Sequence, residues 1–247
     1  MIVLLTDFGW QDPYVGQVKA VLAEAAPGKP VIDLLHAVPD FNAHAGAHLL
    51  DALKSAFPAG AVFLCVVDPG VGGPRQALVA EADGQWFVGP DNGLLSIAAG
   101  RASKTRYWRI AWQPETLSDS FHGRDQFAPI AAALAGGQFP EDRLEPVDAP
   151  EVRFDLAELP RIIFIDHYGN AWTGIRGGVL SDVATLEVKG KALERKAVFH
   201  EAGKGDAFWY VNSSGMAEIA VNRGSAAEQL GLKVGDLVRL PTASASH

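Results

Sequence analysis

The chain has a single cysteine, and none of its apolar runs approaches the ~20 residues that a membrane-spanning helix needs. An intrachain disulfide is therefore excluded. Cys65 lies inside the apolar run 61–67, where a small core residue is expected rather than a nucleophile. The N-terminus lacks a basic segment ahead of an apolar stretch, so we expect no signal peptide. Together these absences favour a cytoplasmic protein.

Basic residues are also few, since 21 Lys and Arg stand against 29 Asp and Glu, for a formal net charge of −8. Nucleic acid is bound mainly through phosphate contacts, so this excess of acids argues against a nucleic-acid partner. The content of 48% hydrophobic and 20% charged residues is typical of a soluble globular protein. We therefore expect neither a nucleic acid nor a membrane as partner.

The first 150 residues alternate apolar runs with stretches of helical periodicity. Helices are predicted from Asp12-Pro13 onward, at 43–57 and at 125–135, because Asp is a favoured N-cap and Pro a favoured first helical residue. Strands are predicted at 2–5, 31–35, 61–67, 77–82, 86–88 and 107–112. This alternation predicts an α/β domain over 1–150, with a mostly parallel sheet and helices on both faces.

The pattern of residues changes after Gly137. Four prolines and scattered acids in 138–160 predict connecting chain, with 151–160 as the linker between domains. Short strands are then predicted at 162–165, 184–188, 196–199, 207–211, 217–221 and 237–240. They indicate a small antiparallel β-barrel domain over 161–247. Residues 225–240 predict a helix-turn-strand, and the Ala/Ser tail 242–246 is predicted to be disordered.

The turn from Asp68 to Arg75 directly follows the apolar run 61–67. Asp68 therefore lies at the carboxyl end of a predicted strand, the sheet edge where α/β proteins bind ligands. Glycines and prolines fold the chain back tightly and can bring Arg75 near Asp68, with His122 as a further partner. From the turn alone, a surface ion pair is the alternative. The Lys-Ser/Thr ending of a phosphate-binding loop is missing.

Other polar groups allow more than one interpretation. Asp7 and Asp12 flank a strand-to-helix turn, where two carboxylates can hold a ribose diol or an ammonium group, or cap a helix. His44 and His48 share one helical face, as in some metal sites or as surface decoration. The stretches 165–173 and 210–215 combine a carboxylate, amides and aromatic rings, which suit a zwitterionic ligand carrying a heteroaromatic base or ordinary turns.

Six short motifs occur in order along nearly the whole chain. They are Thr6-Asp7-Phe8-Gly9, Asp68-Pro69-Gly70-Val71-Gly72, Gly89-Pro90-Asp91-Asn92-Gly93-Leu94, Phe121-His122-Gly123-Arg124-Asp125, Asp166-His167-Tyr168-Gly169-Asn170 and Asn212-Ser213-Ser214-Gly215. With this set the chain resembles the S-adenosyl-L-methionine (SAM) hydroxide adenosyltransferases, relatives of fluorinase and chlorinase.

The resemblance implies an α/β domain, a β-barrel domain and a homotrimer that binds SAM between adjacent subunits. It implies that water or hydroxide attacks C5′ of SAM and that the products are adenosine and L-methionine. SAM is the substrate of this reaction, so no cofactor and no metal are implied.

The resemblance also assigns roles to individual positions. Asp68, Arg75 and His122 correspond to the residues that activate the water. Asp7 corresponds to the ligand of the ribose diol, and Phe41 to an aromatic residue that covers the substrate. Ligands of the methionine and adenine parts are implied at Asp12, Asp166, Ser213, Tyr168, Asn170, Phe199 and Arg223, the last through its backbone.

Three alternatives remain open on the sequence. A halogenase on the same scaffold is disfavoured by Asp68, because a carboxylate repels a halide and the halogenases have neutral residues there. A SAM or nucleoside sensor would not need Asp68, Arg75 and His122 together. A metal-dependent hydrolase would use His44 and His48. Relative to the halogenases, Ser214 replaces an arginine, which alters the expected grip on the carboxylate, and Tyr168 replaces a phenylalanine.

Overall fold

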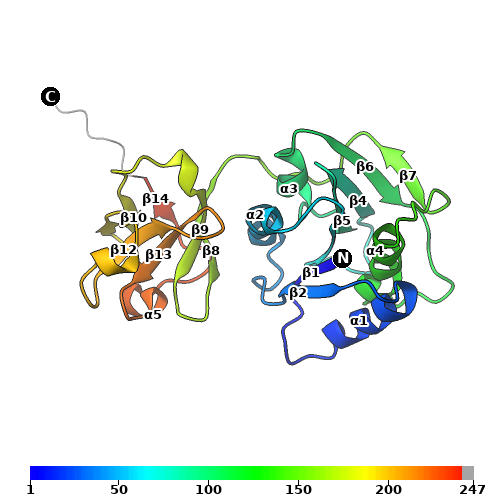
Figure 1. The fold of residues 1–247 in the computed structure, drawn as a ribbon, viewed down its shortest axis with the longest axis horizontal. Coiled ribbons are helices and arrows are strands. Elements are labelled where there is room, and N and C mark those ends of the chain that lie inside the picture. Colours follow the sequence, from blue (N-terminus) through cyan, green and yellow to red (C-terminus); the bar gives the residue numbers. More distant parts are fainter. Residues whose placement is uncertain (241–247) are drawn as a thin grey trace. The chain divides into compact units, whose positions relative to one another are not determined.

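A seven-stranded sheet runs through the first 156 residues of the computed structural model, which describes residues 1–240 (Figure 1). Its strand order is β2-β1-β3-β5-β4-β6-β7. The strands are β1 (Ile2–Thr6), β2 (Val31–Leu35), β3 (Val62–Val66), β4 (Ala77–Ala82), β5 (Gln85–Pro90), β6 (Thr105–Ile110) and β7 (Leu144–Val147). Every residue of β1 and β3 is buried, as expected of strands that are covered on both faces.

The predicted mostly parallel sheet is wrong for half of the strand pairs. β1 pairs in parallel with β2 and β3, and β3 with β5, whereas β4 runs antiparallel to β5 and β6, and β6 to β7. The reversal begins at the tight turn Asp83-Gly84 between β4 and β5, where both residues have positive φ. Such a two-residue turn joins only antiparallel strands. The first unit is therefore a mixed α/β domain.

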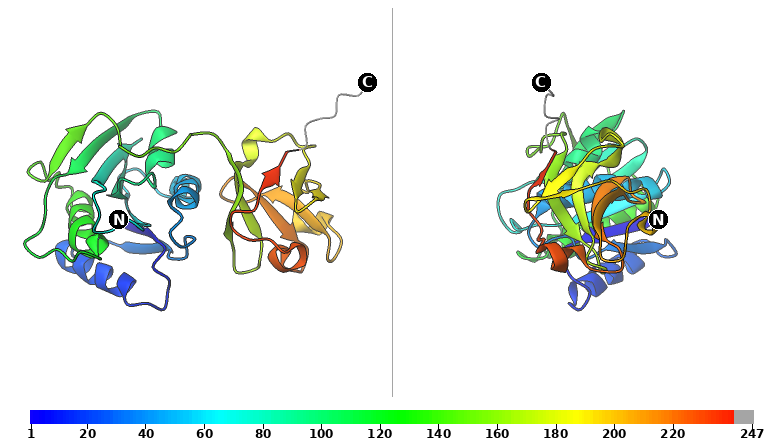
Figure 2. Two further views of the ribbon diagram at one scale, coloured as in Figure 1. Left: turned by 180° about the vertical axis from the view of Figure 1, so that it is seen from behind. Right: turned by 90° about the vertical axis from the view of Figure 1, so that its left-hand side faces the viewer.

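Helices cover both faces of this sheet, as predicted. α1 (Tyr14–Ala25) and α4 (Ala128–Ala135) pack side by side and share a core with Leu4 and Leu64 (Figures 1 and 2). The opposite side carries α2 (Ala43–Leu53), the 3₁₀ turn η1 (Lys54–Ala56) and the short α3 (Ser96–Gly100). There Gly46 of α2 fits closely against Leu94 and Val38, because a Cβ at this position would lie 2.8 Å from the Leu94 Cδ1 atom and 3.1 Å from the Val38 Cγ1 atom.

Two helix starts differ from the prediction. α1 begins at Tyr14 with Pro13 at the N-cap and no side-chain cap, so Asp12 does not cap it. The predicted helix 125–135 is two elements: the π-helical turn η2 (Gly123–Phe127), followed by α4. Single π-turns inside helices are frequent at functional sites, and His122 stands at the N-cap of this one.

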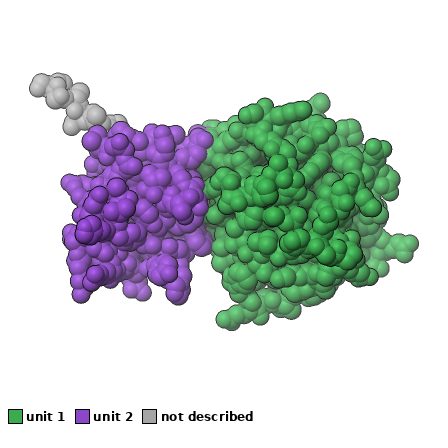
Figure 3. All heavy atoms as spheres, in the orientation of Figure 1, with its two compact units in different colours: residues 1–156 green, residues 157–247 purple. Residues whose placement is uncertain are grey.

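The chain divides into two compact units between Leu156 and Ala157, within the predicted linker 151–160 (Figure 3). The first part of that segment nevertheless packs on the first unit. The Asp91 carboxylate accepts the backbone N–H groups of Glu151 at 2.8 Å and Val152 at 3.3 Å, and Phe154 stacks on His44. The second unit then begins close to β8 (Leu159–Ile165).

The second unit has two antiparallel sheets that share a core including Ile162, Leu186 and Trp209. The four-stranded sheet has the order β12-β13-β9-β8, and the three-stranded sheet the order β11-β10-β14. The remaining elements are β9 (Ala171–Arg176), η3 (Gly177–Val179), β10 (Leu186–Val188), β11 (Lys191–Leu193), η4 (Phe199–Glu201), β12 (Ala207–Val211), β13 (Met216–Val221), α5 (Ala226–Leu230) and β14 (Val238–Arg239). α5 and β14 confirm the predicted helix-turn-strand at 225–240. Closure of the two sheets into a barrel stays a prediction.

The strand prediction for this unit assigned one strand wrongly and missed β9 and β11. Residues 196–199 form no strand, since a 3₁₀ turn begins at Phe199. β9 was not predicted because it contains Gly174, a residue that weakens strands. A Cβ at Gly174 would lie 2.6 Å from the Leu159 carbonyl oxygen, so glycine lets β8 approach closely. The predicted disordered tail 242–246 lies outside the described residues. Within residues 1–240, every helix is too short or too polar to cross a membrane.

Candidate active site

Two carboxylates follow neighbouring parallel strands at the same edge of the large sheet. Asp7 comes directly after β1, and Asp68 comes two residues after β3, whose Val66 is paired with Thr6. The backbone N–H of Asp7 donates to the Val66 carbonyl at 3.3 Å, which extends the ladder as far as the carboxylates. The fold therefore places Asp7 and Asp68 at the carboxyl edge, where ligands of open sheets bind.

Arg75 connects Asp68 to His122. Its Nε donates to both carboxylate oxygens of Asp68, at 3.1 and 3.0 Å, and its Nη2 donates to Oδ2 at 2.5 Å. The same Nη2 lies 2.9 Å from Nδ1 of His122. The guanidinium also lies 5.3 Å from the centre of the Phe127 ring, a cation–π distance. Three residues that the sequence spreads from position 68 to position 122 thus form one hydrogen-bonded group.

The contact with Arg75 determines the protonation of His122. A guanidinium only donates hydrogen bonds, so Nδ1 must accept and the ring hydrogen lies on Nε2. Burial and then the positive charge of Arg75 lower the pKa of His122 from its usual 6.5. His122 is therefore a neutral imidazole whose Nε2–H is available as a donor at neutral pH.

A cavity of about 110 Å³ lies beside this group. It is lined by Asp7, Phe8, Phe41, Val66, Asp68, Val71, Ser120, Phe121, His122 and Gly123. Oδ2 of Asp7 accepts the backbone N–H of Phe41 at 3.1 Å, and burial raises the pKa of the Asp7 carboxyl. Phe41 has φ of 59°, which is unusual for a bulky residue, and the residue is 74% exposed. Phe41 is therefore an exposed aromatic residue whose backbone is anchored to Asp7.

Several residues of the six motifs hold the segments that line this cavity. The Asn92 side chain donates to the Val67 carbonyl at 2.7 Å, immediately before Asp68. Gly72 has φ of +77°, and a Cβ there would overlap the Asp119 carbonyl oxygen. Arg124 pairs with Asp125, which accepts the Ser118 N–H at 2.9 Å. These contacts hold the 68–75 turn and the 118–122 segment together.

Arg75 and His122 also line a second, more polar cavity of about 440 Å³. Its other polar side chains are those of Gln76, Arg109, Gln113, Gln126 and Glu145. His122 therefore borders both the small cavity that contains Asp68 and a larger space suited to ordered water.

The second unit has its own candidate binding cavity, of about 560 Å³. It is lined by Asp166, Tyr168, Asn170, Phe199, Tyr210, Val221, Arg223 and Gly224. Asp166 organises one wall: its Oδ1 accepts the backbone N–H groups of Tyr168 and Asn170, each at 2.9 Å, and its Oδ2 accepts the Asn170 amide at 3.1 Å. Tyr168 is 75% exposed, and Arg223 has φ of 60°. A carboxylate, an amide and three aromatic rings thus meet in one pocket.

Two predicted ligands line neither cavity. Asp12 and Ser213 are both exposed at the surface of their units. His44 and His48 lie with ring centres 5.4 Å apart in α2, and His44 stacks on Phe154 at 4.2 Å. Residues 1–240 contain no group of three or more His, Cys, Asp or Glu side chains arranged to hold a metal ion. The pair His44/His48 therefore belongs to no metal-binding cluster within that range.

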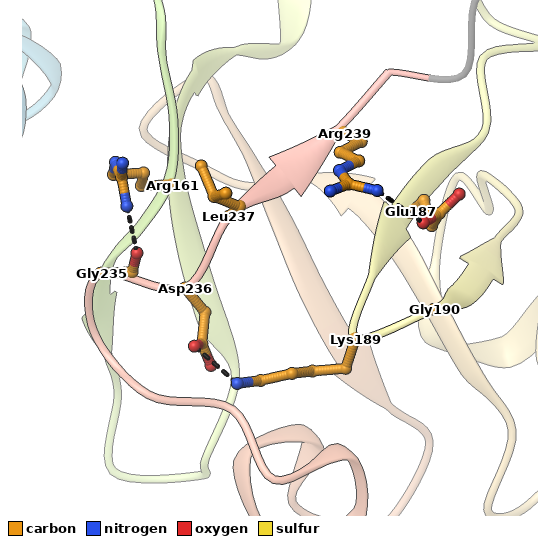
Figure 4. Close-up of a pocket in the computed structure, with 8 residues that line it drawn as sticks. All are labelled: Arg161, Glu187, Lys189, Gly190, Gly235, Asp236, Leu237 and Arg239. Atoms are coloured by element: carbon orange, nitrogen blue, oxygen red, sulfur yellow. Dashed lines mark hydrogen bonds and ion pairs between the residues drawn. The ribbon is translucent and has the colours of Figure 1, made fainter.

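A charged cavity of about 480 Å³ lies elsewhere in the second unit and contains none of the predicted site residues (Figure 4). Its charges are satisfied within the cavity. Lys189 pairs with Asp236 at 2.6 Å, Arg239 lies 3.8 Å from Glu187, and Arg161 donates to the Gly235 carbonyl at 2.8 Å.

The structure adds cavity residues that the sequence analysis did not select. In the first unit they include Val71, Ser120 and Phe121, and in the second unit Tyr210. Phe121 and Tyr210 belong to stretches already recognised as unusual, so their density of aromatic and polar groups was a usable signal. Val71 belongs to the Asp68–Gly72 motif but has no polar group that would mark it as a site residue, and Ser120 has no local signal, since only folding brings it to the cavity.

Comparisons with known proteins match this chain to one family over nearly its whole length. The profile of the SAM hydroxide adenosyltransferase N-terminal domain matches residues 2–144, and that of the C-terminal domain matches residues 160–239. A (R)-S-adenosyl-L-methionine hydrolase of Thermus thermophilus is 41% identical, with 97% of this chain and 98% of the relative covered. A fluorinase of Actinopolyspora mzabensis is 27% identical, with coverages of 97% and 96%.

A solved structure also superposes on most of the chain. The crystal structure of an uncharacterized conserved protein from Thermotoga maritima gives a TM-score of 0.87 at 32% sequence identity, covering 97% of this chain and 99% of the other. Both units therefore have counterparts in a single known chain.

Proposed function

The chain belongs to the SAM hydroxide adenosyltransferase family, and we propose that it hydrolyses SAM to adenosine and L-methionine. The observation that carries the proposal is the Asp68–Arg75–His122 group beside a cavity at the carboxyl edge of the sheet. The relatives named as SAM hydrolases are more similar to this chain than those named as fluorinases.

The chemistry needs an aligned oxygen nucleophile more than it needs an acid. A water oxygen forms a bond to C5′, the C5′–S bond breaks, and the electron pair goes to sulfur, which leaves as the neutral thioether of methionine. One proton leaves the attacking water. Because a sulfonium is already a good leaving group, orientation of the water and acceptance of its proton are the steps left to the protein.

Asp68 is the acceptor that we assign to the water proton. Arg75 holds this carboxylate through both oxygens and leaves other lone pairs of Asp68 available to the cavity. The neutral His122 can donate from Nε2 and orient the water oxygen. The polar cavity behind Arg75 and His122 is our candidate for the store of water.

The remaining roles follow the resemblance and stay proposals. Asp7 would accept the ribose hydroxyls and Phe41 would cover the nucleoside. Asn170, Phe199 and the backbone near Arg223 would bind adenine beside Tyr168. Asp12, Asp166 and Ser213 would bind the methionine part. Support for Asp7 comes from its lining position, whereas Asp12 and Ser213 have no such support.

We also propose that the protein works as a homotrimer with sites between adjacent subunits. Cavities for small organic ligands usually measure about 300–1,000 Å³. The cavity beside Asp68 measures about 110 Å³, too little for a molecule of the size of SAM. The adenine-binding candidates belong to the other unit of the chain. A neighbouring subunit would complete the site, and the cytoplasm remains the proposed location.

A halide-transferring activity is disfavoured by the same group. A carboxylate in the cavity repels a small anion, and here Asp68 lines the cavity. Hydrolysis places a neutral water in that position instead. A sensor without catalytic activity would not need the hydrogen-bonded group of Asp68, Arg75 and His122.

The test is product identification. Purified protein incubated with SAM, without added metal and with a chelator as a parallel arm, is expected to form adenosine and methionine in equal amounts by mass spectrometry. Methylthioadenosine or S-adenosylhomocysteine as the main product would contradict the proposal. Loss of activity with the chelator would instead favour the metal-dependent alternative.

A further inference from the structure

Glu218 is a carboxylate buried in the middle of the four-stranded sheet of the second unit. It lies on β13, only 2% exposed, directly opposite Tyr210 on β12. Charged side chains are seldom buried so completely unless both oxygens find donors. In the roles proposed above Glu218 has no part, yet it lies behind a residue that lines the candidate adenine cavity.

Both oxygens of Glu218 have partners. The Tyr210 hydroxyl lies 2.6 Å from Oε1, and the Asn212 amide nitrogen lies 2.8 Å from Oε2. The pKa of Glu218 is raised, first by burial and also by the charge of Asp166, while the hydrogen bonds from Tyr210 and Asn212 favour the carboxylate and act in the opposite direction. One buried side chain thus holds two segments, the end of β12 and the turn after it.

The orientation of the Asn212 amide is determined independently of Glu218. Its Oδ1 accepts the backbone N–H groups of Ser214 and Met216, each at 3.0 Å. Its nitrogen must therefore face Glu218, and Oε2 must be an acceptor. A flipped amide would lose both backbone bonds.

The polarity of Tyr210 follows from this arrangement. With the carboxylate as acceptor, the Tyr210 hydroxyl donates its only hydrogen to Oε1. Its oxygen then has lone pairs but no hydrogen for a ligand. Because Tyr210 lines the cavity of about 560 Å³, that cavity presents an acceptor at this position.

We propose that Glu218 is a positioning residue which makes the Tyr210 hydroxyl a hydrogen-bond acceptor, so that Tyr210 binds an N–H group of the substrate. The inference rests on the proposed function, because SAM offers two such groups. One is the exocyclic amine of adenine and the other is the ammonium of the methionine part. A carbonyl at the same place would meet the lone pairs of Tyr210 and be rejected.

Glu218→Gln tests the polarity without changing the shape of the side chain. The carbonyl oxygen of the new amide must face the Asn212 nitrogen, so the new amide nitrogen faces Tyr210. The Tyr210 oxygen then accepts a hydrogen bond from this nitrogen, and its own hydrogen is released toward the cavity. The substitution therefore converts Tyr210 from an acceptor into a donor for ligands. Tyr210→Phe removes the hydroxyl and keeps the ring.

The measurement is calorimetric binding to the full-length protein of adenosine against inosine, and of L-methionine against 4-(methylthio)butanoate, which lacks the amine. If adenine is the donor, wild type prefers adenosine to inosine, and Tyr210→Phe reduces this ratio about 3- to 10-fold, the effect of one hydrogen bond. Glu218→Gln reduces the ratio further or reverses it. If the ammonium is the donor, the two variants reduce the preference for L-methionine over 4-(methylthio)butanoate instead.

Glu187→Gln, which changes a partly exposed carboxylate on β10, is the matched control and is expected to leave both ratios unchanged. Unchanged ratios in both Tyr210→Phe and Glu218→Gln would overturn the inference, as would a uniform weakening of all four ligands by Glu218→Gln. Absence of SAM turnover in wild type would instead contradict the proposed function, while the binding ratios would still decide the role of Glu218.

Discussion

At the residue scale, the candidate chemistry depends on one nitrogen of Arg75. Nη2 serves both the Asp68 carboxylate and the His122 ring, so these three residues can act as a unit. Removing any member disturbs the other two, because a partly buried guanidinium loses a partner or a carboxylate loses its donors. Single and double substitutions are then expected to be far from additive.

Asp68→Asn is expected to separate catalysis from binding. The amide keeps an oxygen for Arg75 but no longer accepts a proton from water. Turnover should fall by about 10²–10⁴-fold, the usual contribution of a positioned base, while the dissociation constant for SAM changes by less than about threefold. Single-turnover kinetics beside a binding isotherm measures both quantities. Near-normal turnover would return Asp68 to the role of a structural ion pair.

The acid side of the pH–rate profile reports on His122. Its pKa is lowered below 6.5 by burial and Arg75, so the neutral ring persists as the pH falls through 6.5. Protonation of Nδ1 at a lower pH removes the acceptor for Arg75. We therefore expect turnover to decline only below pH 6.5, and His122→Asn, with a neutral acceptor, to lack this decline. A midpoint at or above 6.5 in wild type would contradict the assignment.

At the element scale, the turn 68–75 reaches its place by a close backbone contact. Gly72 lies against the Asp119 carbonyl with a left-handed backbone, which leaves no room for a Cβ. The contact joins the turn to the segment that leads into the π-helical turn and His122. The spacing between Arg75 and His122 is therefore set by a backbone approach as well as by side chains.

Gly72→Ala is expected to lower both stability and turnover. The added Cβ would overlap a carbonyl oxygen, and positive φ adds strain of about 1–3 kcal/mol. The matched control is Gly16→Ala in α1, where nothing lies within 4 Å of the new Cβ and where stability should rise by about 0.5–1 kcal/mol. Chemical denaturation and initial rates measure the two effects. Equal stability of the two variants would refute the close contact.

At the scale of the whole molecule, the candidate groups are divided between two units. The Asp68–Arg75–His122 group, which we propose activates the nucleophile, belongs to residues 1–156, and the adenine-binding candidates belong to the second unit. In a ring of subunits with head-to-tail contacts, the two halves of one site come from different chains. Two inactive variants can then complement each other.

Mixed assemblies test this directly. Asp68→Asn inactivates the part of the site in the first unit. Asp166→Asn removes the carboxylate charge from the cavity of the second unit. If sites lie between subunits, refolded 1:1 mixtures should recover up to about a quarter of wild-type activity, since a quarter of random pairings join two intact halves. Light scattering should report a trimer. Mixtures that remain as inactive as the separate variants would show that each site is completed within one chain.

Particular residues show which features of the fold could be predicted from the sequence. Asp7 and Asp68 were predicted at strand ends because a short apolar run followed by glycine or proline is a local signal. The same locality explains the strands 31–35, 77–82 and 207–211, which the structure reproduces residue for residue. The direction of β4 was missed although Asp83-Gly84 is itself a local hairpin signal.

The sequence by itself determined most strands and helices of the first unit, the change of pattern between the two units and the edge at which the carboxylates lie, because apolar periodicity and turn residues act over a few positions. Only the tertiary structure decided that Arg75 meets His122, that Tyr210 faces Glu218 across β12 and β13, and that Asp12 and Ser213 line neither cavity. These facts depend on strand register and loop packing, which bring together residues far apart in the chain and are therefore absent from any local pattern.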